Sequence, residues 1–330
     1  MIDIVWLHTY KNKEIGGGSF MFEQINELAK RDGVNVEILY LHNLFNPYNF
    51  FKYLFLYRNK YSDKIIHAQY GSSTGFFSIL LRAKARVISL KGSDWYYLGE
   101  NVSSYNKLRA LIAVYLTRFS LSYYDEIIVM SEKMRTSIVN WRSSLFNRIT
   151  VIPDGIDMEK FYPLDKNKAK EKLGLASDYF VVGFGTFDRK NKIKRLWIVE
   201  NAIKLLEKQY KVKLLVISGV SPSEMNMYLN ACDLIALAST HEGWPNIIKE
   251  GLACNIPFIS TDVSDLKIIN DRLLLGCKVV SGSVESFMNG IESFIKEYNF
   301  NNLNASYRDK ISFLSIENNV DKILSIYKKK

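Results

Sequence analysis

The chain is poor in the features that mark secreted, zinc-binding and membrane-spanning proteins. Its three cysteines, Cys232, Cys254 and Cys277, are widely spaced and odd in number, which suits neither a disulfide framework nor a zinc site. A reducing cytoplasm is therefore expected. The absence of any run of 18 apolar residues predicts that nothing spans a bilayer. Asp3 stands where a signal peptide would carry its basic region, so no signal peptide is expected.

Acidic residues are outnumbered, with 34 Asp and Glu against 44 Lys and Arg and a net charge of +10. The basic excess divides evenly between residues 1–160 and the remainder, whereas a nucleic-acid-binding face usually concentrates it. We therefore expect no nucleic-acid partner. Attraction to anionic lipid or to a phosphorylated donor would explain the excess, and so would a merely basic soluble protein. The length of 330 residues leaves room for two ordinary domains.

Alternating strand-like and helix-like segments predict an α/β fold. Residues 3–7 form an apolar strand that leads through a glycine-rich loop into a helix, and residues 34–40 form the next strand. This order predicts a parallel sheet with right-handed crossovers. The Gly16-Gly17-Gly18 run lets the backbone approach a ligand closely. It lacks the Gly-x-Gly-x-x-Gly spacing, and no acidic residue ends the second strand, so a dinucleotide site is disfavoured.

One stretch of the second half, residues 234–265, predicts a strand, a loop, a helix and a second strand. Pro245 suits the first helical position, because its missing amide would have no partner there in any case. The amides around Gly243 and Trp244 would then point out of a helix N-terminus, where a phosphate or another anion is favoured. The stretch therefore predicts part of a nucleotide site.

Two carboxylates accompany this helix start, Glu242 in the loop and Glu250 inside the helix, with seven residues between them. Carboxylates accept hydrogen bonds from the diols of a sugar or a ribose. From the spacing alone, a capping role for Glu242 and a solvated position for Glu250 are equally open.

The E-x7-E pair, followed by GLACNIP at residues 251–257 and STDV at residues 260–263, resembles the C-terminal signature of family-four glycosyltransferases. These are retaining enzymes of the GT-B fold. The run WPNIIKE at residues 244–250 is closest to the branch that builds bacterial surface polysaccharides. The resemblance implies two Rossmann-like parallel-sheet domains that face a central cleft. It places an acceptor domain at 1–160, a donor domain at 161–312, and a C-terminal helix at 313–330 that packs back on the first domain.

Further family motifs recur in order along the chain, with departures. Lys194 matches the lysine that grips the donor diphosphate, whereas Thr186 replaces the arginine that accompanies it. Arg189 or Lys190 is expected to supply the missing charge, although a lysine-rich surface loop would also explain both. Val220 is the expected contact to the base. Downstream, the usual Gly and Glu of the donor pocket are Ser264 and Ile268.

The resemblance implies the following sites. The donor-binding residues are Gly17, Gly18, Arg189, Lys190, Val220, Gly243, Trp244, Pro245, Asn246 and Glu250. The catalytic residues are Glu242, Lys194 and Asp94, with Glu242 on the hydroxyls of the donor sugar and Glu250 on the ribose. The acceptor side consists of His67, Lys91 and Asp94. No Asp-x-Asp motif occurs, so neither a metal ion nor another cofactor is implied.

Two of the acceptor-side matches are inexact. The family usually reads His-Gly-x-Asp where this chain has Lys91-Gly92-Ser93-Asp94, and Asp154 replaces the Asn of the usual crossing between domains. For His67, a buried strand-end histidine is as good an interpretation as a substrate contact.

Two basic, aromatic segments at residues 43–60 and 107–124 would suit a membrane interface. Packing of core helices would also explain them. If they lie at a membrane, they are where a lipid-linked acceptor would be met.

The resemblance implies a retaining, metal-independent glycosyltransferase, and together with the basic, aromatic segments it predicts a location at the inner face of the cell membrane, in peripheral contact with anionic lipid. It would move a sugar from a nucleotide-sugar donor to a growing lipid-linked saccharide of a capsule or O-antigen. A UDP-sugar is the first choice of donor and GDP-mannose the second. Two alternatives stay open: a sugar-nucleotide epimerase of the same fold, and a non-catalytic partner subunit of a glycosyltransferase complex.

Overall fold

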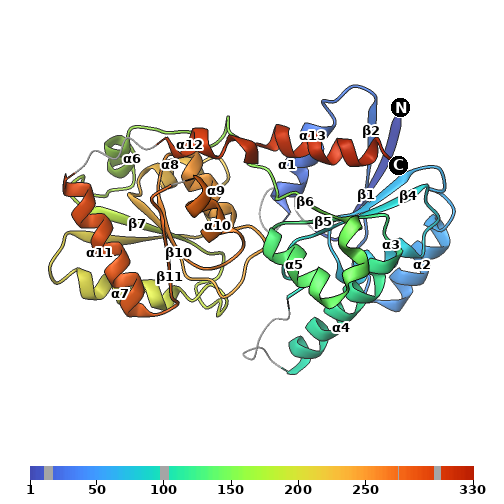
Figure 1. The fold of residues 1–330 in the computed structure, drawn as a ribbon, viewed down its shortest axis with the longest axis horizontal. Coiled ribbons are helices and arrows are strands. Elements are labelled where there is room, and N and C mark those ends of the chain that lie inside the picture. The colour runs from blue at the N-terminus through green and yellow to red at the C-terminus, as the bar shows by residue number, and fades with distance from the viewer. Residues whose placement is uncertain (11–17, 97–103, 274, 301–305) are drawn as a thin grey trace. The chain divides into compact units, whose positions relative to one another are not determined.

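The computed structural model describes residues 1–10, 18–96, 104–273, 275–300 and 306–330. The chain divides into two units (Figure 1), one made of Met1–Gly155 with Ile316–Lys330 and the other of Ile156–Ser315. Among the described residues, none of the helices combines the length and the apolar character that crossing a membrane requires.

The first unit contains a parallel sheet in the order β2-β1-β3-β4-β5-β6. Its strands are β1 (Ile2–His8), β2 (Val34–Tyr40), β3 (Ile65–Ala68), β4 (Ala85–Leu90), β5 (Glu126–Val129) and β6 (Ile149–Val151). Its helices are α1 (Ser19–Leu28), α2 (Pro47–Tyr57), α3 (Ser72–Ile79), α4 (Ser104–Ser120), α5 (Glu132–Trp141) and α13 (Ile316–Tyr327), with 3-10 turns at Leu121–Tyr123 and Ser143–Arg148. Every neighbouring pair of strands is parallel, as the sequence predicts.

Alternation along the strands sends side chains to two helical layers of this unit. Val5, Leu7 and Ile66 pack with Phe77 of α3, and the rings of α2 lie against the same cluster. On the other face, α1 and α13 contact each other (Figure 1). The C-terminal helix is held there by its buried Tyr327, whose hydroxyl accepts a hydrogen bond from Trp6 Nε1 at 3.0 Å.

The second unit contains a parallel sheet in the order β11-β10-β9-β7-β8. Its strands are β7 (Phe180–Gly185), β8 (Val212–Ile217), β9 (Leu234–Leu237), β10 (Phe258–Thr261) and β11 (Lys278–Val280). Its helices are α6 (Lys166–Lys172), α7 (Leu196–Leu206), α8 (Met225–Asn230), α9 (Asn246–Ala253), α10 (Leu266–Leu273), α11 (Val284–Phe300) and α12 (Tyr307–Lys310), with a 3-10 turn at Ser312–Leu314. Helices α7 and α11 pack together against one face, over Val182 and Phe184 (Figure 1).

The helix α9 differs by one position from the sequence prediction. It begins at Asn246, and Pro245 is its N-cap with an extended backbone rather than its first helical residue. The missing proline amide is equally harmless at either place. Two glycines let this helix lie close to the sheet: a Cβ at Gly185 would come 2.9 Å from Ile247 Cδ1, and one at Gly251 would come 2.8 Å from Ile235 Cγ1.

Candidate functional site

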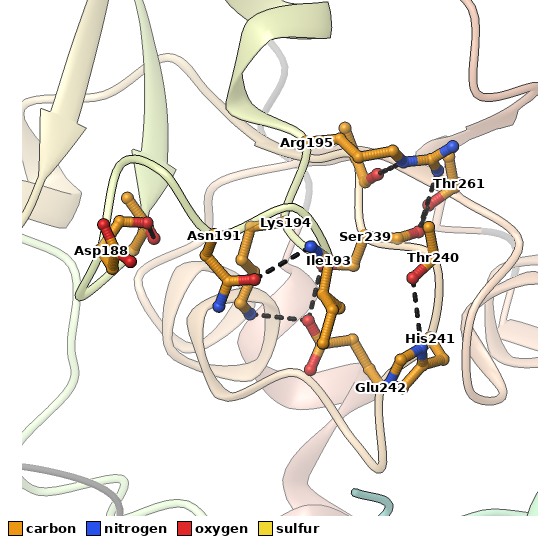
Figure 2. Close-up of polar contacts among 12 residues, drawn as sticks. Asp188, Asn191, Ile193, Lys194, Arg195, Ser239, Thr240, His241, Glu242 and Thr261 are labelled. Atoms are coloured by element: carbon orange, nitrogen blue, oxygen red, sulfur yellow. Dashed lines mark hydrogen bonds and ion pairs between the residues drawn. The ribbon is translucent and has the colours of Figure 1, made fainter. Parts of the chain in front are cut away.

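The centre of the candidate site is an ion pair between two loops at the carboxyl ends of strands in the second unit. Lys194 lies in the loop after β7, and Glu242 lies in the loop after β9. Lys194 Nζ is 2.6 Å from Glu242 Oε1, as Figure 2 shows, with side-chain exposures of 25% and 17%. Ligands of open parallel sheets bind outside the carboxyl ends of the strands, so this charge pair lies where a substrate would be met.

Short hydrogen bonds fix the two loops against each other. Ser239 Oγ donates to the same Glu242 Oε1 at 2.6 Å. The Thr240 amide donates to the Ile193 carbonyl at 3.0 Å, and Asn191 Oδ1 accepts from the Ile193 amide at 2.9 Å (Figure 2). The Lys194 and Glu242 backbones are therefore held in register before any ligand binds.

Arg195 supports the loop that carries Glu242. No sequence pattern singled this residue out. Its guanidinium donates to the Ala238 carbonyl at 2.6 Å and to the Ser239 carbonyl at 3.1 Å. Thr261 Oγ1 donates to the same Ser239 carbonyl at 2.6 Å (Figure 2). Burial lowers the pKa of Arg195. Its backbone is left-handed, with φ of 50°, which is an unusual conformation for a residue other than glycine.

The helix α9 begins four residues after Glu242, at Asn246, and its N-terminus has no side-chain cap. Gly243 and Trp244 are buried. The Gly243 carbonyl accepts a hydrogen bond from Ser264 Oγ at 2.7 Å. Lys249 Nζ lies 5.6 Å from the centroid of the Trp244 ring. A rigid, uncapped helix start with a basic side chain behind it is favourable for an anion.

The loop after β7 carries the basic residues predicted to replace the missing arginine. Thr186 Oγ1 donates to the Asp188 carbonyl at 2.7 Å, and the Lys190 amide donates to Asp188 Oδ1 at 2.8 Å. Arg189 and Lys190 are exposed. Within the described part of the chain neither forms an ion pair, so their charges are open to a ligand. Their predicted role on the donor phosphates stays a prediction.

The remaining donor residues lie at the same edge of this sheet or in α9. Val220 is half-buried in the loop after β8, Asn246 is exposed at the start of α9, and Glu250 is half-buried one turn later. Glu250 lies close enough to Cys254 that its charge adds to the burial that raises the pKa of that thiol to about 12. Gly17 lies outside the described residues, and Gly18 precedes α1 in the first unit.

His241 is a second residue that the sequence analysis missed. It adjoins Glu242, and its Nδ1 lies 3.1 Å from Thr240 Oγ1 (Figure 2). Burial lowers its pKa, the Glu242 charge opposes that shift, and the Lys194 charge adds to it. Only its position next to the E-x7-E pair could have drawn attention to it.

In the first unit, Asp94 is fully buried and holds its own loop. Its carboxylate accepts from the Gly71 amide at 2.9 Å, the Lys91 amide at 3.0 Å and the Gly92 amide at 2.9 Å. Burial raises the pKa of the Asp94 carboxyl, and the amide donors offset part of that rise. This geometry favours a loop-holding role, and a direct catalytic role for Asp94 stays a prediction.

Lys91 and Asp154, two of the residues that depart from the family pattern, form an ion pair with each other. Lys91 Nζ lies 2.5 Å from Asp154 Oδ1, and the side chains are 8% and 11% exposed. The basic residue in place of His and the acidic residue in place of Asn therefore contact each other.

His67 is buried completely, with both ring nitrogens engaged. Nδ1 faces the Tyr327 hydroxyl in a hydrogen bond, and Nε2 lies 2.9 Å from Ser89 Oγ. Burial lowers the pKa of His67 well below its usual value, and the Lys91 charge lowers it further. The geometry favours the packing interpretation over a substrate contact. Among the described residues there is no group of three or more His, Cys, Asp or Glu side chains that could hold a metal ion.

Comparison with known proteins finds a family model that matches part of the chain. Residues 169–311 match the family model described as glycosyl transferases group 1. This segment is therefore similar to group 1 glycosyltransferases. The matched segment includes Lys194, Arg195, Glu242 and Glu250, whereas the predicted donor residues Gly17 and Gly18 lie outside it.

The curated relatives of this chain include two bacterial proteins that are glycosyltransferases by name. The chain is 26% identical over 202 residues to the capsular polysaccharide biosynthesis glycosyltransferase CapM of Staphylococcus aureus, covering 52% of this chain and 48% of that protein. It is 26% identical over 219 residues to the UDP-Gal:alpha-D-GlcNAc-diphosphoundecaprenol alpha-1,3-galactosyltransferase of Escherichia coli, covering 54% of each. The chain thus matches about half the length of these relatives.

Solved structures show the fold over the whole chain. Sucrose-phosphate synthase of Thermosynechococcus elongatus matches with a TM-score of 0.77 at 16% identity, covering 100% of this chain and 99% of that one. Anabaena HepE in complex with UDP and glucose matches with a TM-score of 0.74 at 17% identity, covering 100% of both. The predicted GT-B fold is confirmed.

Proposed function

We propose that this protein transfers a sugar from a nucleotide-diphosphate sugar to a hydroxyl of a growing, lipid-linked cell-surface saccharide, with retention at the anomeric carbon. A UDP-sugar is the favoured donor and GDP-mannose the next. The observation that carries the proposal is the Lys194–Glu242 ion pair beside the uncapped start of α9.

The electrostatics of the second unit support the donor half of this reaction. The demanding step is the build-up of negative charge on the departing diphosphate, and prearranged cations and helix amides stabilise such charge without reorganisation. Lys194 would exchange its contact with Glu242 for the diphosphate. Glu242, released from that contact, would accept hydrogen bonds from the donor sugar. Glu250 would hold the ribose, and Arg189 and Lys190 would add positive charge.

The names of the relatives support the acceptor half. The galactosyltransferase of Escherichia coli takes a diphosphoundecaprenol-linked sugar by name, and the CapM protein belongs by name to capsular polysaccharide biosynthesis. We therefore propose a saccharide on a polyprenyl diphosphate as acceptor, with the loop held by Asp94 on the acceptor side. Exposed aromatic and basic side chains of α2 and α4 would bring the first unit to the inner face of an anionic membrane.

Retention and independence from metal belong to the proposal as well. Their support is the match to the family signature and the lack of an Asp-x-Asp motif in the sequence. The diphosphate would be neutralised by Lys194, the α9 amides and the basic loop after β7 instead.

The testing experiment is a screen of purified protein with UDP-, GDP- and ADP-sugars that measures the melting temperature and donor hydrolysis. The Lys194→Ala and Glu250→Ala variants should lose the response to the one donor that stabilises the wild type. Lys192→Ala, an exposed neighbour, should keep it. Added EDTA should leave turnover unchanged.

Three outcomes would contradict the proposal. If no nucleotide sugar shifts the melting temperature, the chain is better explained as a non-catalytic partner subunit. If donor alone yields an epimerised nucleotide sugar, the epimerase alternative replaces transfer. If EDTA abolishes turnover and a divalent cation restores it, the metal-independent mechanism is wrong.

A further inference from the structure

A cavity lies in the first unit, and none of its lining residues is a predicted donor residue. It has a volume of about 460 Å³, and its lining includes Thr9, Tyr40, His42, Phe45, Ser73 and Arg109. The volume is in the range of small-ligand sites, roughly 300–1,000 Å³. Thr9 directly follows β1, and His42 lies two residues after the end of β2, so the cavity is at the carboxyl ends of these strands, where ligands of such sheets bind.

The charge of the lining favours an anion. Arg109 contributes a guanidinium, and none of the lining residues is acidic. Its Cζ lies 5.0 Å from the centroid of the Phe45 ring, which orients the guanidinium while leaving its N–H donors for a ligand. Ser73 belongs to the first turn of α3, where the helix dipole adds partial positive charge. The hydroxyls of Thr9 and Ser73 add further donors, whereas the Tyr40 hydroxyl lies 3.3 Å from His42 Nδ1.

Exposed apolar side chains on two helices adjoin this cavity. On α2, which begins two residues after Phe45, Tyr48, Phe51 and Phe55 are 73%, 66% and 89% exposed. On α4, the helix that carries Arg109, the exposed residues are Leu108, Leu111, Ile112, Tyr115 and Phe119. Both sets recur every three or four residues, so each forms one face of its helix.

Packing of the unit's own core does not account for these faces. No residue of α2 is buried, although its Phe50, Tyr53, Leu54 and Tyr57 pack partly against the core from the opposite side. Helices α2 and α4 are linked through α3, because the Phe76 ring lies 6.3 Å from that of Phe50 and 5.9 Å from that of Phe119. An anion-favouring cavity thus lies beside exposed apolar side chains of the first unit.

We infer that the Arg109 cavity binds the diphosphate of a polyprenyl-diphosphate-linked acceptor, with the hydrocarbon on the exposed faces of α2 and α4. This inference rests on the proposed function, because it names the place where that function's acceptor is held. Such an acceptor is a single ligand that is anionic at its diphosphate and apolar along its hydrocarbon. This combination matches the anion-favouring cavity and the exposed apolar side chains beside it.

The test measures binding of farnesyl diphosphate, inorganic pyrophosphate and farnesol to the full chain by calorimetry. Arg109→Gln removes the charge, and Ser73→Phe fills the cavity. Arg142→Gln is the matched control, because Arg142 is also exposed and stacks on an aromatic ring, with its Cζ 4.6 Å from the Trp141 centroid. Unchanged melting temperatures would show that the variants are folded.

Farnesyl diphosphate should bind the wild type more tightly than either fragment. Arg109→Gln and Ser73→Phe should each weaken this binding at least about tenfold, because a charge-assisted contact or the cavity itself is lost. Arg142→Gln should bind within about twofold of the wild type.

Equal affinity of Arg109→Gln and the wild type would overturn the inference, as would an equal loss in Arg142→Gln. Phosphatidylglycerol vesicles form a separate arm: if they bind in an Arg109-dependent way while farnesyl diphosphate does not, the cavity serves a membrane headgroup and the acceptor assignment is wrong. The donor screen on the wild type reports separately on the proposed function, because donor binding belongs to the second unit.

Discussion

Lys194 Nζ and Glu242 Oε1 lie 2.6 Å apart, although 48 positions separate the two residues in the sequence. Both side chains are partly exposed, so water screens the pair, and such pairs contribute no more than about 1 kcal/mol to folding. A contact of this strength can be exchanged for a ligand. Substitution of either residue should therefore affect donor binding much more than stability.

The first prediction concerns Lys194→Ala. Loss of the cation should lower the rate of sugar transfer at least about a hundredfold, because stabilisation of the leaving diphosphate loses a major electrostatic contribution. The free energy of unfolding should change by less than about 1 kcal/mol. Steady-state kinetics with the identified donor and urea unfolding measure the two effects. Lys192→Ala is the control, and a similar rate loss in that variant would show that general surface charge is responsible.

The fold could be predicted from the sequence because its strands are buried and its strands and helices alternate regularly. Residues 180–185 and 234–237 are nearly continuous apolar runs, as strands covered on both faces should be, and the structure pairs both in a parallel sheet. The start of α9 was predicted one position early, since a proline fits both the N-cap and the first turn.

The residues that hold the site in place could not be predicted from the sequence in the same way. Arg195 acts through two carbonyls of a loop more than forty positions away, and no local pattern encodes such a contact. Lys91 and Asp154 looked like two separate departures from the family, and only their proximity shows that they are one ion pair. Sequence motifs identify residues that meet a ligand, whereas the groups that hold those residues depend on tertiary structure.

The second prediction separates the side chain of Arg195 from its backbone. Arg195→Ala and Arg195→Gly both lose the hydrogen bonds to Ala238 and Ser239, so both should reduce transfer by displacing the Glu242 loop. The alanine variant should also be less stable than the glycine variant by about 1 kcal/mol, because φ of 50° strains any residue with a Cβ. Urea unfolding compares the two, and equal stability would show that the loop relaxes out of the left-handed conformation.

The third prediction concerns acid stability and His67. Burial lowers the folded-state pKa of His67, so below pH 6.5 the unfolded chain binds a proton that the folded chain does not. Stability should therefore fall as the pH drops below 6.5, by about 1.4 kcal/mol per pH unit, until the folded-state pKa is reached. Urea unfolding at pH 6.5 and 5.5 measures the slope.

His67→Gln supplies the comparison for that slope. It should be less stable than the wild type at pH 6.5, because the hydrogen bonds to Tyr327 and Ser89 are disturbed. Its stability should change less between the two pH values, since it lacks the proton-binding group. An identical pH dependence in the two proteins would assign the acid sensitivity to other groups.

The last prediction is a double-mutant cycle on Lys91 and Asp154. Their side chains are 8% and 11% exposed, so removing one partner leaves a poorly solvated charge, at a cost of about 3 kcal/mol. Lys91→Met and Asp154→Asn should each be destabilised by about that amount in urea unfolding. The combined variant should be no less stable than either single variant, because both charges of the ion pair are then removed together. Additive losses would mean that each residue is held by different partners, and the two departures from the family pattern would then be independent after all.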